Sequence, residues 1–140
     1  DGDERRARRR LRRLGWSGVD EFVDLTVAGE YGERPYAPLL GDGAVHRRFA
    51  VADGGAPPPE AMEAILAAVD AAVASGRVVY VHCHGGIGRT GTVVGCWLVR
   101  HGCGADEALG RLAELRQGTA DAGLPSPETR EQRELVLSWR

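Results

Sequence analysis

The 140-residue chain contains no lysine and no asparagine, so all 18 of its basic side chains are arginines. This usage is typical of a GC-rich genome and suggests a bacterial source. Against 20 acidic residues the formal net charge is −2, and the pI is about 6.1. A charge this close to balance gives no argument for nucleic acid or a membrane surface as the main partner.

Long apolar runs are also missing. No stretch approaches the roughly 18 residues of a membrane span, and no apolar segment of a secretory signal follows the arginine-rich start. The cysteines are few and odd in number, at positions 83, 96 and 103, and do not make a disulfide framework. We therefore expect a cytoplasmic protein that is neither inserted in a membrane nor exported. A start of DGDERRARRR also fits one domain cut from a longer protein.

The length fits one compact domain, and 43% hydrophobic residues are enough to build a core. Residues 4–14 carry seven arginines and predict a short helix with little apolar face. We assign residues 1–18 to an arginine-rich N-terminal helix and residues 19–140 to a single globular domain. The helix is expected to be solvated, with an arm for phosphate-rich partners as the alternative.

Periodicity predicts the remaining elements. Strands are expected at 19–27 and 44–51, with a surface loop at 28–43 between them, and a helix at about 59–75. The apolar run RVVYVH at 77–82 is typical of a central strand covered on both faces. Three helices follow, at 89–101, around 105–115, and after Ser126, which we expect to be the N-cap with Pro127 at the first helical position. This order predicts an α/β fold with a central, mostly parallel sheet flanked by helices.

The most informative stretch is HCHGGIGRT at 82–90, between the predicted strand and a buried helix. Such a loop directs backbone N–H groups and the positive end of a helix dipole into one small space, which suits a tetrahedral oxyanion. The planar fork of Arg89 can bind two oxygens of a phosphate. The glycines allow positive φ and a close approach to the anion: Gly85, Gly86 and Gly88.

Cys83 would then lie at the floor of a phosphate cradle, whose donors also favour a thiolate nucleophile. In-line attack on phosphorus gives a phosphocysteine, and the leaving oxygen needs a proton from a separate acid. Asp53, 30 residues upstream in the loop ADGGAPP, is the best candidate. Asp42 and Asp70 compete less well, because Asp42 lies in the earlier loop and Asp70 on a helix.

HCHGGIGRT resembles the signature of cysteine-based protein tyrosine phosphatases, in which His-Cys is followed by five residues, Arg and Ser or Thr. The aspartate loop precedes the cysteine, as in the tyrosine-specific and dual-specificity branch. The resemblance covers residues 19–140, including DLT, ADGGAP and SPETREQ. It implies the protein tyrosine phosphatase fold and a hydrolase of phosphotyrosine, with phosphoserine and phosphothreonine left open, acting on proteins through a phosphocysteine intermediate.

The resemblance also implies roles for individual residues. Cys83 would be the nucleophile, Arg89 the phosphate clamp, and Asp53 the acid and then the base that activates water. His82 would hold the loop from behind, and Thr90 would hydrogen-bond the sulfur and help it leave.

Further residues are expected around the substrate. Gln132 resembles the glutamine that orients the hydrolytic water in tyrosine-specific relatives, whereas Glu128 stands where those relatives place another glutamine. Tyr36 is expected to bind substrate, and Tyr31 and Arg34 are further candidates for the rim. The phosphate itself is expected to contact the signature loop: His84, Gly85, Gly86, Ile87, Gly88 and Arg89.

Other interpretations remain open. His82, His84, His101 and Cys103 invite a zinc site, but neither a CxxC nor an HxxxH pair is present, so we expect no metal and no cofactor. The expected partner is a phosphorylated protein or a small phosphomonoester, without a membrane or nucleic acid. The alternatives are a phosphatase of a phosphoinositide or an RNA 5′-phosphate, and a non-catalytic phosphate-binding module.

Overall fold

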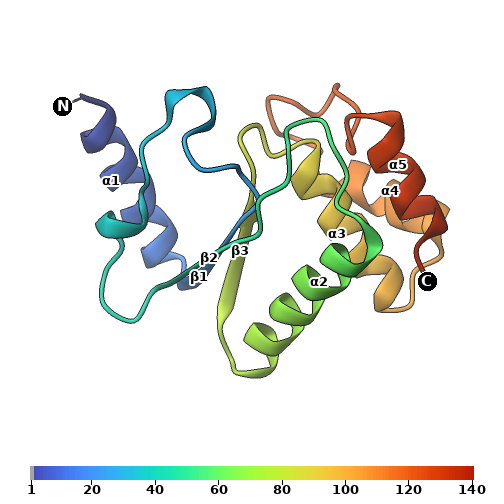
Figure 1. The fold of residues 1–140 in the computed structure, drawn as a ribbon, viewed down its shortest axis with the longest axis horizontal. Helices are drawn as coiled ribbons and strands as arrows, with labels where there is room; N and C mark the ends of the chain where they lie inside the picture. The colour runs from blue at the N-terminus through green and yellow to red at the C-terminus, as the bar shows by residue number, and fades with distance from the viewer. Residues whose placement is uncertain (1) are drawn as a thin grey trace.

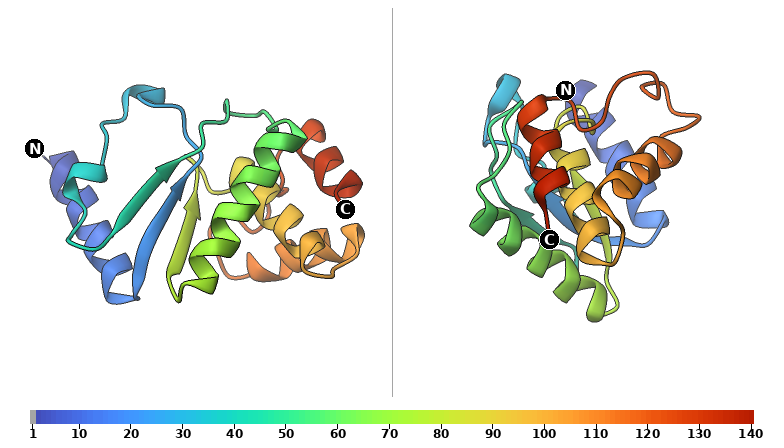
Figure 2. Two further views of the ribbon diagram at one scale, coloured as in Figure 1. Left: turned by 60° about the horizontal axis from the view of Figure 1, so that its bottom comes forward. Right: turned by 90° about the vertical axis from the view of Figure 1, so that its right-hand side faces the viewer.

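A computed structural model describes residues 2–140. Three parallel strands form the sheet in the order β2-β1-β3, so that β1 (Val19–Asp24) lies between β2 (Val45–Arg48) and β3 (Val78–His82). Helix α1 (Gly2–Trp16) and the chain between β1 and β2 lie on one side of the sheet, and the four later helices lie on the other (Figures 1 and 2). The predicted α/β architecture is confirmed.

The four later helices are α2 (Pro59–Ala74), α3 (Arg89–Arg100), α4 (Ala105–Leu115) and α5 (Arg130–Ser138). Helix α3 contacts each of the other three, so the helix that begins at Arg89 is packed on several sides. The core between these helices and β1 is apolar and includes Val23, Leu25, Met62, Ile65, Leu66, Val93, Cys96, Leu112 and Val136.

The arginine-rich helix predicted for residues 4–14 is α1, which extends over residues 2–16. None of its residues is fully buried, although Ala7, Leu11 and Leu14 are half-buried and recur at helical spacing. Within residues 2–140, no helix is both long enough and apolar enough to cross a membrane.

One strand prediction is wrong. β3 is an edge strand, since its only sheet partner within residues 2–140 is β1, and Val78 and Tyr80 are 47% and 36% exposed. The side chains of its apolar run point to both faces of the sheet. Val79 and Val81 pack on the core, whereas Tyr80 packs on aromatic rings of the opposite face. The strand that is buried is β1, from Glu21 through Asp24.

The start of the last helix is also corrected. α5 begins at Arg130 rather than Pro127, because Thr129 is its N-cap and forms a reciprocal capping box with Gln132. The hydroxyl of Ser126 does not cap a helix but donates to the carbonyl oxygen of Ile87 over 2.6 Å. The peptide bond between Ser126 and Pro127 is cis.

All strands point the same way, so their carboxyl ends meet at one edge of the sheet. Three loops leave from this edge: residues 29–36 after β1, residues 52–58 after β2, and the signature loop, residues 83–89, after β3. Ligands of parallel sheets bind at this edge. The fold therefore brings the predicted acid, Asp53, to the same place as Cys83.

Gly95 allows α3 and α5 to approach closely. A Cβ added at Gly95 would lie 2.9 Å from Cγ2 and 3.0 Å from Cγ1 of Val136, which is fully buried. Because valine is branched at Cβ, its methyl groups cannot both turn away from the added atom.

We therefore expect Gly95→Ala to destabilise the fold by about 1–3 kcal/mol in urea unfolding, as overpacking does. The matched control is Gly110→Ala in α4, where an added Cβ meets no atom within 4 Å. That variant should gain up to about 1 kcal/mol from the higher helix propensity of alanine. Equal effects of the two substitutions would contradict this account of the α3–α5 contact.

Candidate active site

Cys83 follows the end of β3 and is half-buried. Its Sγ accepts hydrogen bonds from the backbone N–H of Gly86 over 3.3 Å and from the hydroxyl of Thr90 over 3.0 Å. Two donors directed at one sulfur are the surroundings that an anionic sulfur needs. The structure thus brings Thr90 to the cysteine, as the sequence predicts.

The glycines of the signature loop serve different purposes. Positive φ is found at Gly86, where φ is 73°, but the prediction of positive φ is wrong for Gly85 and Gly88. Gly88 is required by a close approach instead, since a Cβ there would lie 2.9 Å from Oε1 of Gln132. At Gly85 an added Cβ would meet nothing within 4 Å.

Arg89 opens α3 and is 2% exposed. Its Nη1 and Nη2 donate to the two carboxylate oxygens of Glu30 over 3.0 and 2.8 Å, and Nη1 also donates to the carbonyl oxygen of Val51 over 2.8 Å. Burial by itself lowers the pKa of Arg89, but the hydrogen bonds and charge of Glu30 outweigh it and raise the pKa. The guanidinium is therefore held in place and charged.

One edge of this guanidinium remains for a ligand. Nε of Arg89 is buried and makes no hydrogen bond among the described residues. Glu30 occupies the edge formed by Nη1 and Nη2, so the edge formed by Nε and Nη2 is the one that can take two oxygens of a phosphate. A buried donor without a partner is rare in proteins and indicates a site for an acceptor.

Glu30 is a residue that the sequence analysis missed. It lies 59 residues before Arg89, in a loop without a recognised motif. The one signal that points to it is physical: a buried guanidinium needs a carboxylate, and the loop that borders the site holds Glu30 and Glu33.

Removing Glu30 should leave a buried cation without its counter-charge. We expect Glu30→Ala to destabilise the fold by about 3 kcal/mol in urea unfolding. The double variant Glu30→Ala/Arg89→Met should lose less than the sum of the two single variants, because the pair is coupled. The control is Glu134→Ala, which breaks the exposed pair with Arg130 and should change stability by less than about 0.5 kcal/mol. Additive losses at residues 30 and 89 would contradict the coupling.

Asp53 lies beside Arg89, as the sequence predicts. Its Oδ1 is 3.5 Å from Nη2 of Arg89, and its Oδ2 accepts a hydrogen bond from the hydroxyl of Tyr31. The hydrogen bond from Tyr31, and then the charge of Arg89, lower the pKa of Asp53. The competing candidate Asp70 is engaged elsewhere, where it accepts hydrogen bonds from Trp97 of α3 and from His101.

His82, directly before the cysteine, is held from behind. Its Nε2 lies 2.6 Å from the hydroxyl of Tyr36, and its Nδ1 lies 3.4 Å from the carbonyl oxygen of Cys83. Burial lowers the pKa of His82, which favours the neutral ring. The ring of Tyr36 packs edge-on against Phe22 and His46. Tyr36 therefore supports His82, and this position does not support the predicted contact with substrate.

A buried carboxylate stands behind this network. Asp24 accepts hydrogen bonds from the hydroxyl of Thr26 over 2.5 Å and from Nη2 of Arg48 over 3.1 Å, and Nε2 of His46 lies 2.9 Å away. Burial alone would raise the pKa of Asp24, but the hydrogen bonds from Thr26 and His46 outweigh it and lower the pKa to about 2. Nε2 of His82 is 4.0 Å from this carboxylate.

The lowered pKa of Asp24 predicts that Asp24→Asn destabilises the fold by an amount that depends on pH. The fall from 3.8 to about 2 corresponds to about 2 kcal/mol of stability. An ionised Asp24 contributes this free energy above the unfolded pKa near 4 and loses it as pH falls toward 2. Urea unfolding should therefore separate wild type from Asp24→Asn by about 2 kcal/mol at pH 7 and by clearly less at pH 3, with exposed Asp42→Asn as the control. An equal difference at both pH values would contradict the assignment.

The N-terminus of α5 holds the loop that contains Asp53. Nε2 of Gln132 donates to the carbonyl oxygen of Gly55 over 3.0 Å. The hydroxyl of Thr129 donates to the carbonyl oxygen of Gly54 over 3.0 Å. Oε1 of Gln132 accepts the N–H groups of Glu128 and Thr129, both over 3.1 Å. Gln132 is thus fully buried and holds the Asp53 loop, while its predicted role in orienting water stays a prediction.

The predicted phosphate contact His84 has protein partners of its own. Its Nδ1 lies 2.9 Å from Oε1 of Glu33, and its ring lies against that of Tyr31, with centroids 4.6 Å apart. Ile87 is held through its carbonyl oxygen by Ser126, so the backbone of the loop is fixed at a second point.

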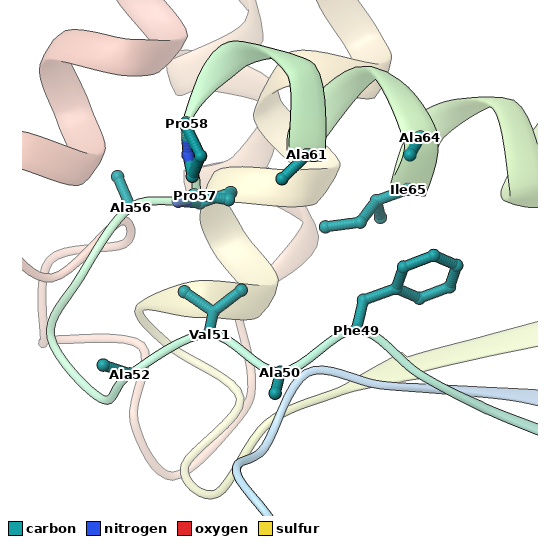
Figure 3. A pocket seen from close by; sticks show the side chains of 10 residues that line it. All are labelled: Phe49, Ala50, Val51, Ala52, Ala56, Pro57, Pro58, Ala61, Ala64 and Ile65. Atoms are coloured by element: carbon teal, nitrogen blue, oxygen red, sulfur yellow. The ribbon is translucent and has the colours of Figure 1, made fainter.

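No metal-binding cluster competes with this site among residues 2–140. No group of three or more His, Cys, Asp or Glu side chains among them could hold a metal ion. A pocket of about 330 Å³ lies between residues 49–58 and α2, and Figure 3 shows that apolar side chains line it, among them Phe49, Val51 and Ile65. This pocket offers no charged group to a phosphate.

Comparison with known proteins decides the family. The family described as "Polymorphic toxin system, DSP-PTPase phosphatase" matches residues 2–103. The chain belongs to this family. The predicted class, a cysteine-based phosphatase of the dual-specificity branch, is therefore confirmed.

The relatives of this DSP-PTPase domain agree with that assignment. The chain is 38% identical over 68 residues to tyrosine-protein phosphatase cdc-14 of Caenorhabditis elegans, and 33% identical over 67 residues to tyrosine-protein phosphatase CDC14 of Candida albicans. These matches cover 48% and 47% of the chain but only 9% and 12% of the two relatives, so the chain spans about a tenth of their length.

Solved structures extend the likeness to nearly the whole domain. Tk-PTP in its active form superposes with a TM-score of 0.76 at 29% identity, over 95% of this chain and 82% of that one. Kinase associated phosphatase has a TM-score of 0.77 at 19% identity, over 92% and 72% of the two chains. The second likeness shows the fold alone, and it confirms the predicted protein tyrosine phosphatase fold.

Proposed function

We propose that this domain is a metal-independent phosphomonoesterase that acts through a phosphocysteine intermediate. The observation that carries the proposal is that three features lie at the same edge of the sheet: Cys83 Sγ with its two donors, Arg89 with a buried Nε that has no partner among the described residues, and Asp53 beside that guanidinium. A phosphate in the signature loop would meet all of them at once.

In the first step, the thiolate of Cys83 attacks phosphorus and forms a P–S bond as the P–O bond to the alcohol or phenol breaks. Protonated Asp53 gives its proton to the departing oxygen. The Nε and Nη2 edge of Arg89 binds two non-bridging oxygens, where charge must be stabilised in the transition state.

In the second step, Asp53 is a carboxylate and accepts a proton from the water that attacks phosphorus, while the P–S bond breaks. The hydroxyl of Thr90 donates to the departing sulfur of Cys83. This role is supported by the 3.0 Å hydrogen bond between them. The free enzyme and inorganic phosphate are restored.

The proposed substrate is phosphotyrosine in a protein, with phosphoserine and phosphothreonine as further substrates. Between its cysteine and its arginine the signature loop carries no basic residue except His84. A loop of this charge favours a single phosphate over the several phosphates of a phosphoinositide. The substrate would be supplied by a kinase reaction.

The family indicates the kind of biological system in which the activity would be used. Its description refers to polymorphic toxin systems, and we propose that this domain is the phosphatase component of such a system. We further propose that residues 19–140 form the phosphatase unit and that residues 1–18 are an added helix. A bacterial source and a cytoplasmic site of action stay predictions.

The mechanism is tested by hydrolysis of para-nitrophenyl phosphate in EDTA across pH. Wild type should turn over, Cys83→Ser should be inactive, and Asp53→Ala should lose about 100-fold in kcat because general acid catalysis is worth about that much. Cys103→Ser, which makes the same thiol-to-hydroxyl change outside the signature loop, should keep its activity.

Other outcomes favour the alternatives. Folded wild type that binds vanadate without turnover would indicate a phosphate-binding module, and turnover lost only in EDTA would revive a metal site. If a phosphoinositide or an RNA 5′-phosphate were hydrolysed faster than a phosphotyrosine peptide, the proposed substrate class would be wrong.

A further inference from the structure

Side chains of the 29–36 loop contact both of the other loops at this edge of the sheet, the 52–58 loop and the signature loop. Glu30 pairs with Arg89, and Tyr31 contacts both Asp53 and His84. Tyr31 also has an unusual backbone: its φ of 54° makes it the one non-glycine residue with positive φ among residues 2–140. Its neighbours Gly29 and Gly32 have positive φ too.

This backbone directs successive side chains to two partners. Glu30 turns inward to the buried guanidinium and is 12% exposed, whereas Tyr31 is 66% exposed and reaches across the outside to Asp53. A left-handed residue is uncommon for a bulky side chain, and such conformations are kept where surrounding contacts fix them. Here the contacts are the hydroxyl on Asp53 and the ring on His84.

Asp53 has few other restraints. It is followed by two glycines and its side chain is 42% exposed, so the side chain would otherwise sample several rotamers. Tyr31 holds its Oδ2, and Oδ1 then lies 3.5 Å from Nη2 of Arg89. The acid is thereby held on the side of the site that faces the clamp.

We propose that Tyr31 is a positioning residue for the reaction: its hydroxyl holds the carboxyl of Asp53 beside the signature loop, and its ring braces this contact against His84. The proposal rests on the proposed function, because only phosphate transfer gives Asp53 its two roles. It deepens that function by adding a residue that acts through the acid.

The hydroxyl should affect proton transfer as well as orientation. Besides Tyr31, the groups that face Asp53 are Arg89, His84 and the backbone N–H of Gly54. Glu30 lies beyond Arg89. Tyr31 donates to the ionised form, so its removal raises the pKa of Asp53. The proton needed in the first step would then be kept to higher pH, although the carboxyl would be less well placed.

The test compares wild type with Tyr31→Phe, which keeps the ring and removes the hydroxyl. We expect kcat to fall about tenfold from misplacement of the acid, and the alkaline limb of kcat/KM to move to higher pH. In an Asp53→Asn background Tyr31→Phe should have no further effect on kcat. A purely structural role would lower kcat in both backgrounds and leave the limb in place, which would overturn the proposal.

A second readout does not depend on turnover. A ¹³C NMR titration of the Asp53 carboxyl, assigned with Asp53→Asn, should show a higher pKa in Tyr31→Phe than in wild type. Tyr80→Phe, on β3, should leave the titration unchanged. If the protein hydrolyses no phosphate ester but this shift is seen, the proposed function fails and the contact stands. If turnover is normal and the titration is the same in Tyr31→Phe, the positioning role is wrong.

Discussion

The buried guanidinium of Arg89 is the constraint on which the site depends. A cation that is 2% exposed must recover by hydrogen bonds and counter-charge what it loses in hydration. Its partners come from the ends of two other strands: Glu30 follows β1, and the carbonyl oxygens of Leu25 and Val51 follow β1 and β2. Satisfying one side chain thus brings three loops together at one edge of the sheet.

Further hydrogen bonds hold the parts of these loops that Arg89 does not contact. α5 comes last in the chain, yet Thr129 and Gln132 hold the backbone at Gly54 and Gly55, and Ser126 holds Ile87. The start of α5 therefore holds the Asp53 loop, and the segment just before α5 holds the signature loop. The helix that begins at Arg89, α3, packs directly on α5, whose N-terminus holds the Asp53 loop.

The sequence predicted the features that depend on residues close together in the chain. A helical repeat predicted α2 within about a residue, and the spacing of Cys83 and Arg89 predicted the signature loop. Contacts between distant segments were not predictable in this way. Glu30 lies in an irregular loop whose composition indicates a surface loop, and Tyr31, although a candidate for the rim, carried no signal of its contact with Asp53. The edge position of β3 was missed for a related reason, because an apolar run reports burial of its faces and not the number of its neighbours.

The anion site is not visible in the overall charge of the chain. The charges of Arg89 and Glu30 cancel, so the clamp adds nothing to the net charge of −2. A phosphate would be bound by donors in fixed directions rather than by net charge. These donors are one edge of the guanidinium, the N–H groups of the signature loop, and the start of α3. Such a site would bind a tetrahedral dianion by the directions of its donors. Binding of a single phosphate group would depend on this arrangement of donors rather than on a basic surface.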